Sequence, residues 1–228
     1  MSEEEKKNVN VNSEEIKSET KNTVNEVKET IKNVNIKDDA KKTTNFVASM
    51  FNSPLETLKT LANDGKNKNL KNALILMIVW LVVVLVKSLF GYHWAWHFVG
   101  NNILSVIKAL LAPIFGIAGM CLVLYFMQKG EKKSLTTMFT TVTIATTPKI
   151  LVTVLSLLSL FSSKFNTVLT PISNFATVIT IVYMYFATKL LIGNEENSKF
   201  IKKYTLIQAI YFVIYFALTF LEIYIPML

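Results

Sequence analysis

Arginine is absent from this chain of 228 residues, cysteine occurs once and histidine twice. Because all 24 basic residues are lysine, the chain has no guanidinium group for bidentate recognition of phosphate or carboxylate. The single cysteine, Cys121, excludes an internal disulfide. The chain also lacks a GxSxG elbow, an HExxH motif, a P-loop and a glycine-rich dinucleotide turn. We therefore expect no enzymatic activity, no cofactor and no metal site.

Acidic residues are scarce in the last two thirds of the chain. Residues 1–72 hold 13 lysines and 12 acidic residues, whereas residues 73–228 hold 11 lysines and 4 acidic residues. Apolar residues make up 51% of the whole, and the mean hydropathy is +0.39. This split predicts an integral membrane protein whose partner is the lipid bilayer. Basic residues in short loops orient a membrane protein, whereas nucleic-acid binding requires a continuous basic face, so nucleic acid is excluded as a partner.

Residues 1–45 have the composition of a disordered, low-complexity cytoplasmic arm, rich in Lys, Glu, Asn and Thr. Within them Val24, Val27, Ile31 and Val34 recur at helical spacing. This stripe indicates either a short coiled coil or partner-binding helix, or a solvated and fluctuating segment. The β-branched residues and the short length favour the second interpretation.

A short amphipathic helix is predicted just before the first membrane span. Ser53 suits its N-cap, Pro54 its first position and Glu56 the third position of a capping box. Leucines follow on one face, and a turn at Asn63 ends the helix. We expect this helix to lie along the headgroup boundary or to pack under the bundle.

The apolar runs predict an all-α bundle of five spans in a membrane domain over residues 46–228. The spans lie at about 70–90, 103–127, 135–161, 168–192 and 203–225. In the second span Pro113 predicts a kink, and Ala112 and Gly116 form a small-xxx-small pair that favours close helix packing.

The third span is predicted to be broken. Its apolar part, 150–161, is too short to cross alone, and the preceding part contains seven threonines, Pro148 and Lys149. We expect one interrupted helix in which threonine hydroxyls bind the carbonyls that the proline leaves free. The alternative is a re-entrant segment that does not cross.

The lysines near the span ends orient the chain. With a cytoplasmic N-terminus, nine lysines face the inside and three the outside. Those inside are Lys66, Lys68, Lys71, Lys129, Lys132, Lys133, Lys199, Lys202 and Lys203; those outside are Lys87, Lys108 and Lys164. We therefore predict a multi-pass protein of the cell membrane with its C-terminus outside.

Two features invite a functional interpretation. Lys149 falls near the middle of the third span, where a charge is costly, so it is expected to face the bundle interior or a wet cavity; a span that shifts outward and lets it snorkel is the alternative. His93 and His97 have a spacing that could offer two metal ligands, but no third ligand lies nearby. The aromatic residues around them favour a membrane-interface belt instead.

Two segments resemble bacterial Yip1-domain proteins. One is Phe51-Asn52-Ser53-Pro54-Leu55-Glu56-Thr57-Leu58 before the first span, and the other is Ala145-Thr146-Thr147-Pro148-Lys149-Ile150-Leu151 in the third. The resemblance implies a five-span domain over about 46–228 with a cytoplasmic N-terminus. Eukaryotic relatives act in vesicle trafficking and contact Rab-type GTPases, but the Asp-Leu-Tyr-Gly-Pro motif is missing here, so GTPase binding is not implied.

The sequence supports two functional hypotheses. The first is a non-enzymatic scaffold or membrane-organising protein that contacts other membrane proteins or a second copy of itself. The second is a small permease or transporter subunit with the broken third helix and Lys149 along its path. An enzyme that uses His93 and His97 is a third option, and it requires bound metal.

Overall fold

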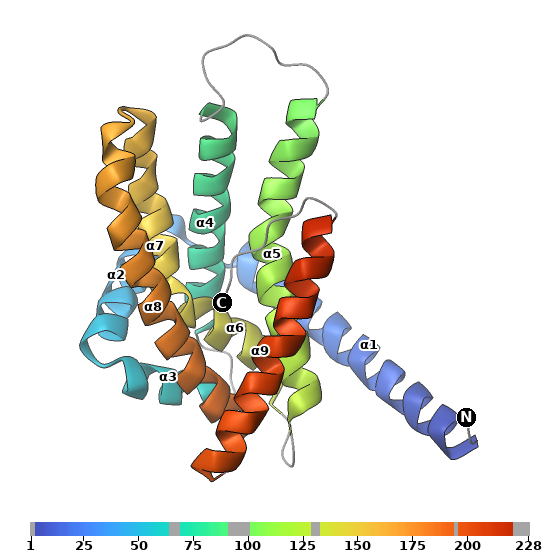
Figure 1. Cartoon of the computed structure of the whole chain (residues 1–228). Coiled ribbons are helices and arrows are strands. Elements are labelled where there is room, and N and C mark those ends of the chain that lie inside the picture. The colour runs from blue at the N-terminus through green and yellow to red at the C-terminus, as the bar shows by residue number, and fades with distance from the viewer. Residues whose placement is uncertain (1–2, 64–68, 91–100, 129–132, 194–195, 221–228) are drawn as a thin grey trace.

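The computed structural model describes residues 3–63, 69–90, 101–128, 133–193 and 196–220, which are helical apart from short connections (Figure 1). In chain order the helices are α1 (Glu3–Lys32), α2 (Ile36–Asn52), α3 (Pro54–Ala62), α4 (Leu70–Phe90), α5 (Asn101–Met127), α6 (Leu135–Ala145), α7 (Thr147–Leu155), the 3-10 helix η1 (Ser156–Leu160), α8 (Lys164–Ile192) and α9 (Asn197–Phe220). Helices α4, α5, α8 and α9 are long and apolar enough to cross a membrane, and α6 with α7 and η1 forms a bent fifth candidate. The predicted all-helical, multi-pass architecture is confirmed at that level.

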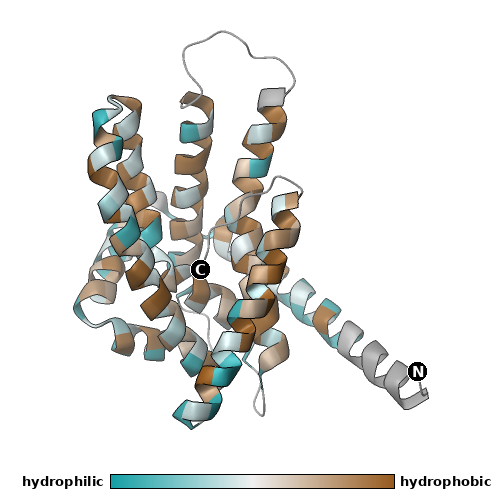
Figure 2. Cartoon of the chain, in the orientation of Figure 1, coloured by the Kyte–Doolittle hydropathy of each residue, from teal (hydrophilic) through white to brown (hydrophobic). Residues whose placement is uncertain are grey.

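Apolar residues run along the four long helices, while the beginning of α9 is polar (Figure 2). Helix α4 lies in the middle of the bundle, where it packs against α1, α2, α5, α6, α7 and η1. Its 21 residues reach about 30 Å at the usual helical rise. Leu76, Trp80 and Val83 are among its buried side chains.

Helix α9 packs on a smooth part of α5. A Cβ built on Gly119 would lie 3.6 Å from Cγ2 of Ile214, which is ordinary van der Waals contact. Ala112, Pro113 and Gly116, for which the sequence predicts a packing role, are buried on the same helix. Pro113 lies inside α5, and the helix continues on both sides of it.

The third apolar segment is broken at Thr146, where α6 and the following helix meet at 48°. Pro148 has no N–H for the carbonyl of Ile144, four residues earlier. The hydroxyl of Thr147 donates to that carbonyl at 2.6 Å instead, and the hydroxyl of Thr146 donates to the carbonyl of Thr143 at 2.6 Å. The predicted exchange of backbone donors for threonine hydroxyls is thus confirmed.

Composition predicts a disordered arm over residues 1–45, and the structure describes this arm from Glu3 onward. The structure is helical over Glu3–Lys32, and α2 runs across the predicted domain boundary. Tertiary contacts are the physical reason: α1 packs on α4 and α6, and α2 packs on α3 and α4. Of the predicted apolar stripe, Val27 and Val34 are half-buried, while Val24 is 44% and Ile31 50% exposed.

The amphipathic helix before the first span is α3, which packs under the bundle against α6 and α8. Ser53 precedes Pro54 as predicted, but its side chain makes no cap hydrogen bond. The N–H of Ser53 donates to the carbonyl of Ser49 at 2.8 Å, because α2 leads directly into α3. That N–H is therefore not left for Glu56, and the predicted capping box does not form.

Candidate functional site

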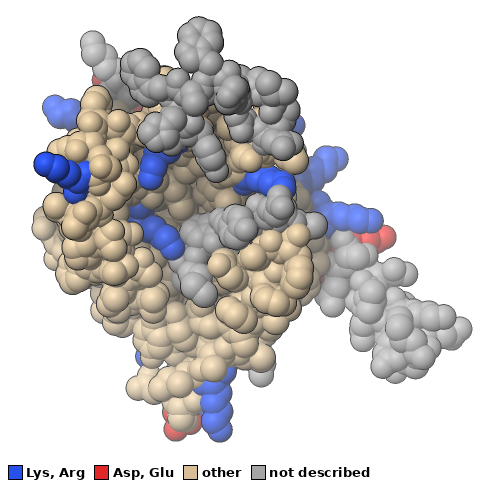
Figure 3. Space-filling view, turned by 45° about the horizontal axis from the view of Figure 1, so that its top comes forward, with Lys and Arg blue, Asp and Glu red and all other residues tan. Residues whose placement is uncertain are grey.

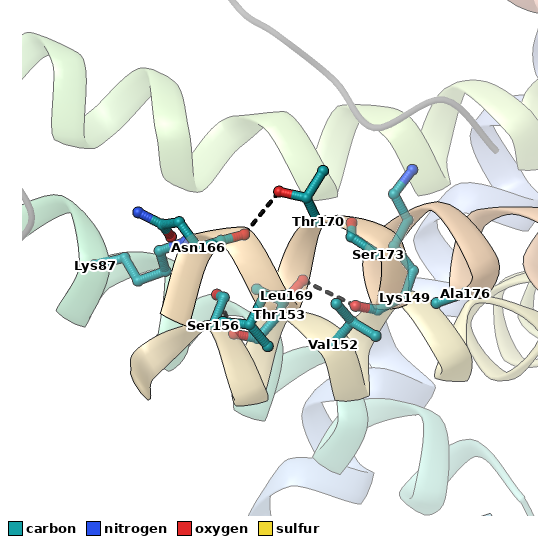
Figure 4. A pocket seen from close by; sticks show the side chains of 10 residues that line it. All are labelled: Lys87, Lys149, Val152, Thr153, Ser156, Asn166, Leu169, Thr170, Ser173 and Ala176. Atoms are coloured by element: carbon teal, nitrogen blue, oxygen red, sulfur yellow. Dashed lines mark hydrogen bonds between the residues drawn. The ribbon is translucent and has the colours of Figure 1, made fainter. Parts of the chain in front are cut away.

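A cavity of about 260 Å³ lies between α4, α7, η1 and α8, with Lys149 in its wall (Figure 4). It is lined by Lys87, Lys149, Val152, Thr153, Ser156, Asn166, Leu169, Thr170, Ser173 and Ala176. Lys149 was expected to face the bundle interior or a wet cavity if the third segment spans, and its place in this wall agrees with that expectation.

Helical spacing places these residues on facing rows. Positions 149, 152, 153 and 156 share one side of α7 and η1, and positions 166, 169, 170, 173 and 176 share one side of α8. Helices α7 and α8 pack against each other along their length, so the two rows oppose one another. Lys87 and Asn166 lie at one end, and Lys149, Ser173 and Ala176 at the other (Figure 4).

The cavity reaches well into the bundle. Residues 166–176 of α8 span about 15 Å at the helical rise. Lys87 lies one turn from the end of α4, while Lys149 lies roughly 20 Å along the helix from the end of η1. Figure 3 looks toward this end of the bundle, where the surface is hollowed and lysine side chains lie along the hollow.

The cavity wall is partly polar and partly apolar. Its ten lining residues include two lysines and no carboxylate. The hydroxyls of Thr153, Ser156 and Thr170 donate to carbonyls of their own helices at 2.9, 2.6 and 2.7 Å. Their lone pairs stay available to water, so they give the wall polarity without further donors.

Three other lining side chains keep their donors. Within the described parts of the chain, the side chains of Lys87, Asn166 and Ser173 make no hydrogen bond. An ammonium, a carboxamide NH₂ and a hydroxyl are all groups that bind anions. The wall of the cavity can therefore donate hydrogen bonds to a bound molecule at Lys87 and Asn166 at one end and at Ser173 toward the other.

The inner end of the cavity is closed. Ala145, Thr146 and Thr147, which precede Lys149, are 0% exposed. Helix α6 behind them is packed on α3, α4, α5 and α8. The cavity is therefore a pocket that ends at Lys149 in this structure, and no path continues beyond it among these residues.

The structure brings together only part of the predicted set. Lys149 lines the cavity and its neighbour Pro148 is buried, whereas Glu56 is exposed on α3, and Ala112 and Gly116 lie on α5. His93 and His97 lie outside the described residues, and no group of three His, Cys, Asp or Glu residues within the described part could hold a metal.

Lys87, Asn166 and Ser173 were missed as site residues. The lysine distribution indicates only an orienting role for Lys87, and the predicted fourth span begins at residue 168, two residues after Asn166. The spacing of Asn166, Thr170 and Ser173 on one face of an apolar helix was the available signal.

A second group of contacts fixes the N-terminal helices to the opposite half of the bundle. The hydroxyl of Thr136 on α6 donates to the carboxylate of Glu26 on α1 at 2.6 Å. Lys71 on α4 pairs with Asp39 on α2 at 2.5 Å, and the hydroxyl of Tyr183 on α8 donates to the carbonyl of Met50 at 2.9 Å. These contacts bind α1 and α2 to three different helices.

In the Asp39–Lys71 ion pair, the carboxylate is shielded from solvent more than the ammonium is. The Asp39 side chain is 8% exposed and that of Lys71 is 32% exposed. The hydrogen bond from Lys71 lowers the pKa of Asp39 below its ordinary value of 3.8, and the N–H of Asn35 at 2.8 Å acts in the same direction. Asp39 is therefore a carboxylate at neutral pH.

Comparison with known proteins gives no relative: no family model, no curated protein and no solved structure matches this chain.

Proposed function

We propose that this chain is a non-enzymatic, multi-pass membrane protein of the Yip1 type. In this proposal it acts as a scaffold or membrane-organising factor through its N-terminal helices and its spans. The observation that carries the proposal is the attachment of α1 and α2 to α4, α6 and α8 by Glu26, Asp39 and Met50. An arm held at three points presents a defined surface to a partner, whereas a tethered random coil does not.

The outer face of α1 supports a binding role. Val24 and Ile31 are seven residues apart, so they lie on one row, and they are 44% and 50% exposed. Thr23, Glu26 and Thr30 are half-buried, and Glu26 contacts Thr136 of α6. Val24 and Ile31 therefore remain accessible, while Glu26 and Ile16 take part in contacts with the bundle.

We also propose five spans, with the N-terminus in the cytoplasm and the C-terminus outside. Lys87, near the end of α4, shares a cavity with Ser156 and Asn166, near the turn between η1 and α8. That turn therefore lies at the level of the α4 C-terminus, which favours a crossing by α6, α7 and η1 over a re-entrant loop. The nine-to-three distribution of lysines supports the orientation.

The Yip1 assignment rests on the two segments that resemble that family. The segment around Pro54 begins a short helix before the first span, and the segment around Pro148 contains the break between α6 and α7. Such an arrangement is compatible with the family's five-span domain, and the assignment remains our proposal.

The scaffold proposal is tested by photo-cross-linking in native membranes. A photoactivatable residue is placed at Val24 or Ile31, and at Lys28 on the exposed side of the same helix as a positional control. We expect a discrete cross-linked product from the probe at Val24 that disappears when I31D is added, and one from the probe at Ile31 that disappears when V24D is added. Products that are unchanged by the added aspartate, or identical to those from the probe at Lys28, would show that α1 is passive.

The permease alternative is favoured by one observation, the cavity that reaches Lys149. It is tested in proteoliposomes with radiolabelled inorganic phosphate and chloride as probes. A transporter should lose uptake in K149L while staying inserted, whereas a scaffold should show no protein-dependent uptake in either form. The closed inner end of the cavity makes the scaffold the better-supported proposal.

A further inference from the structure

The outer side of α1 carries lysines around its two exposed apolar residues. Positions that are spaced alternately by four and three residues share one side of a helix. We call this set the basic row: Lys17, Lys21, Val24, Lys28 and Ile31 at that spacing, with Lys32 one turn after Lys28, all of them exposed. The basic row therefore combines four positive charges with two apolar side chains.

The acidic residues of α1 lie apart from the basic row. Glu19 and Glu26 are half-buried, and Glu26 contacts α6. Glu14 and Glu29 are exposed, but Glu14 precedes the row and Glu29 lies about 140° around the helix from Val24. Within the described residues, the lysines of the row form no ion pair. Their charge is therefore not neutralised by the described part of the chain.

The end of α1 is held at the level where two apolar helices of the bundle begin. Glu26 is bonded to Thr136, the second residue of α6. Shortly after α1, Asp39 on α2 pairs with Lys71, the second residue of α4. Helix α4 begins there as a span candidate, so the headgroup layer of a bilayer would lie at this level.

The basic row is open on the side of the spans. Helix α1 extends away from the bundle (Figure 1), and lysine side chains are in view on it in Figure 3, which is seen partly from the far end of the bundle. A second copy of α1 is a poor occupant, because like charges would face each other. Anionic headgroups above an apolar boundary complement both the lysines and the apolar residues of the row.

We propose that the basic row of α1 binds the surface of a bilayer that contains anionic phospholipids, with the lysines at the lipid phosphates and with Val24 and Ile31 at the apolar boundary. This deepens the proposed membrane-organising role and rests on it, because it names what the outer face of α1 contacts. The contact strengthens about fivefold for each lysine near the anionic surface. Salt screens it, since the Debye length is about 10 Å at 0.1 M.

The test uses the full-length protein in nanodiscs of phosphatidylcholine, or of equal parts phosphatidylcholine and phosphatidylglycerol. Both contain some phosphatidylcholine with a nitroxide on its headgroup, which quenches a fluorophore at the membrane surface. The fluorophore is attached in the C121A background at T20C, one turn before Val24, or at N22C, about 160° around the helix from Val24; both positions are exposed. We expect strong quenching at Thr20 only with phosphatidylglycerol, reduced by added salt, and weak quenching at Asn22 in both lipids.

The role of the lysines is tested by K21Q/K28Q, which removes the two that flank Val24. With phosphatidylglycerol this variant should lower the ratio of quenched to unquenched label at Thr20 at least about fivefold. K41Q/K59Q is the matched control, because Lys41 on α2 and Lys59 on α3 are exposed but lie outside the row. Unchanged amide exchange of α4 in both variants checks that the bundle is intact.

Three results would overturn the inference: equal quenching at Thr20 in the two lipids, equal quenching at Asn22, or an equal loss in K41Q/K59Q. If quenching is absent while the probe at Val24 yields a protein product in native membranes, the row binds an acidic protein. The lipid inference then fails and the scaffold role stands. Lipid-dependent quenching without a protein product would support the inference and reject a protein partner at α1.

Discussion

At the residue scale, Thr147 occupies the position that decides how the broken helix is held together. Its hydroxyl donates to the carbonyl of Ile144. Pro148, four residues after Ile144, has no N–H to bind that carbonyl. Both Thr147 and Ile144 are 0% exposed, so no bulk water can replace the bond. A buried carbonyl without a donor costs free energy comparable to a lost hydrogen bond.

We expect T147V to destabilise the protein by about 1–3 kcal/mol, because valine keeps the shape and removes the donor. The control is T177V. Thr177 makes the same kind of bond to the carbonyl of Ser173 at 2.9 Å, but inside a continuous helix whose backbone already supplies a donor. The measurement is the free energy of unfolding in detergent; equal losses in the two variants would contradict the role given to Thr147.

The ion pair of Asp39 and Lys71 predicts an acid-dependent attachment of α2. Because Lys71 lowers the pKa of Asp39 in the folded state, the stabilisation is present above the ordinary value of 3.8 and is lost as the pH falls through the lowered pKa. Amide exchange of α2 should therefore rise below pH 3.8 in the natural sequence.

The variant D39N should show faster exchange of α2 at neutral pH and no further rise on acidification. D38N is the control, since Asp38 is exposed and accepts a bond only from Asn35 on its own segment. An acid response that persists in D39N would assign the effect to another group.

Individual site residues could be predicted from the sequence only where polar residues interrupt the apolar run of a single span. Lys149 and the threonines before Pro148 stand out because a cation, a proline and hydroxyls interrupt an apolar run. Lys87 and Asn166 could not be paired with them, because their contact depends on how α4 and α8 pack around α7. Long-range packing of this kind leaves no local pattern.

At the scale of single elements, the half-buried side of α1 is largely polar, with Ile16 packed against the core. The residues of α1 that lie half-buried include Glu19, Thr23, Glu26 and Thr30, at spacings of three and four. Composition predicted disorder here because charge and few aromatics characterise disordered chains. The predicted spans agreed with the helices far better, because their apolar runs are long and bounded by polar residues.

The bond between Thr136 and Glu26 predicts how α1 is released. In T136V the Glu26 carboxylate loses the bond from Thr136, and hydrogen bonds to charged groups contribute about 1.5–3 kcal/mol. We expect amide exchange of α1 to rise about tenfold or more while exchange of α2 stays the same.

The matched control for this release is T30V. Thr30 lies on α1 but donates to the carbonyl of Glu26 at 2.7 Å within its own helix, so its loss leaves the contact with α6 intact. Equal release in T30V would mean that the helicity of α1, and not its contact with α6, determines the exchange.

At the scale of the whole molecule, the number of spans depends on the bent pair. The four long helices are recognised by length and apolarity alone, whereas α6, α7 and η1 reach that length only together. Sequence left two possibilities because a proline and a lysine fit both a broken span and a re-entrant loop. The cavity that joins Lys87 to Ser156 and Asn166 favours the crossing.

A cysteine placed in the turn between η1 and α8 distinguishes the two topologies. Cys121 is buried and is replaced in C121A to give a cysteine-free background. S162C in the five-span topology faces outside, so a membrane-impermeant maleimide should label it in intact cells. N197C, at the start of α9, should be labelled only after the membrane is opened, because it lies at the other end of α8. Labelling of N197C in intact cells and protection of S162C would mean that the third segment is re-entrant and returns to the cytoplasmic side. The C-terminus would then lie in the cytoplasm.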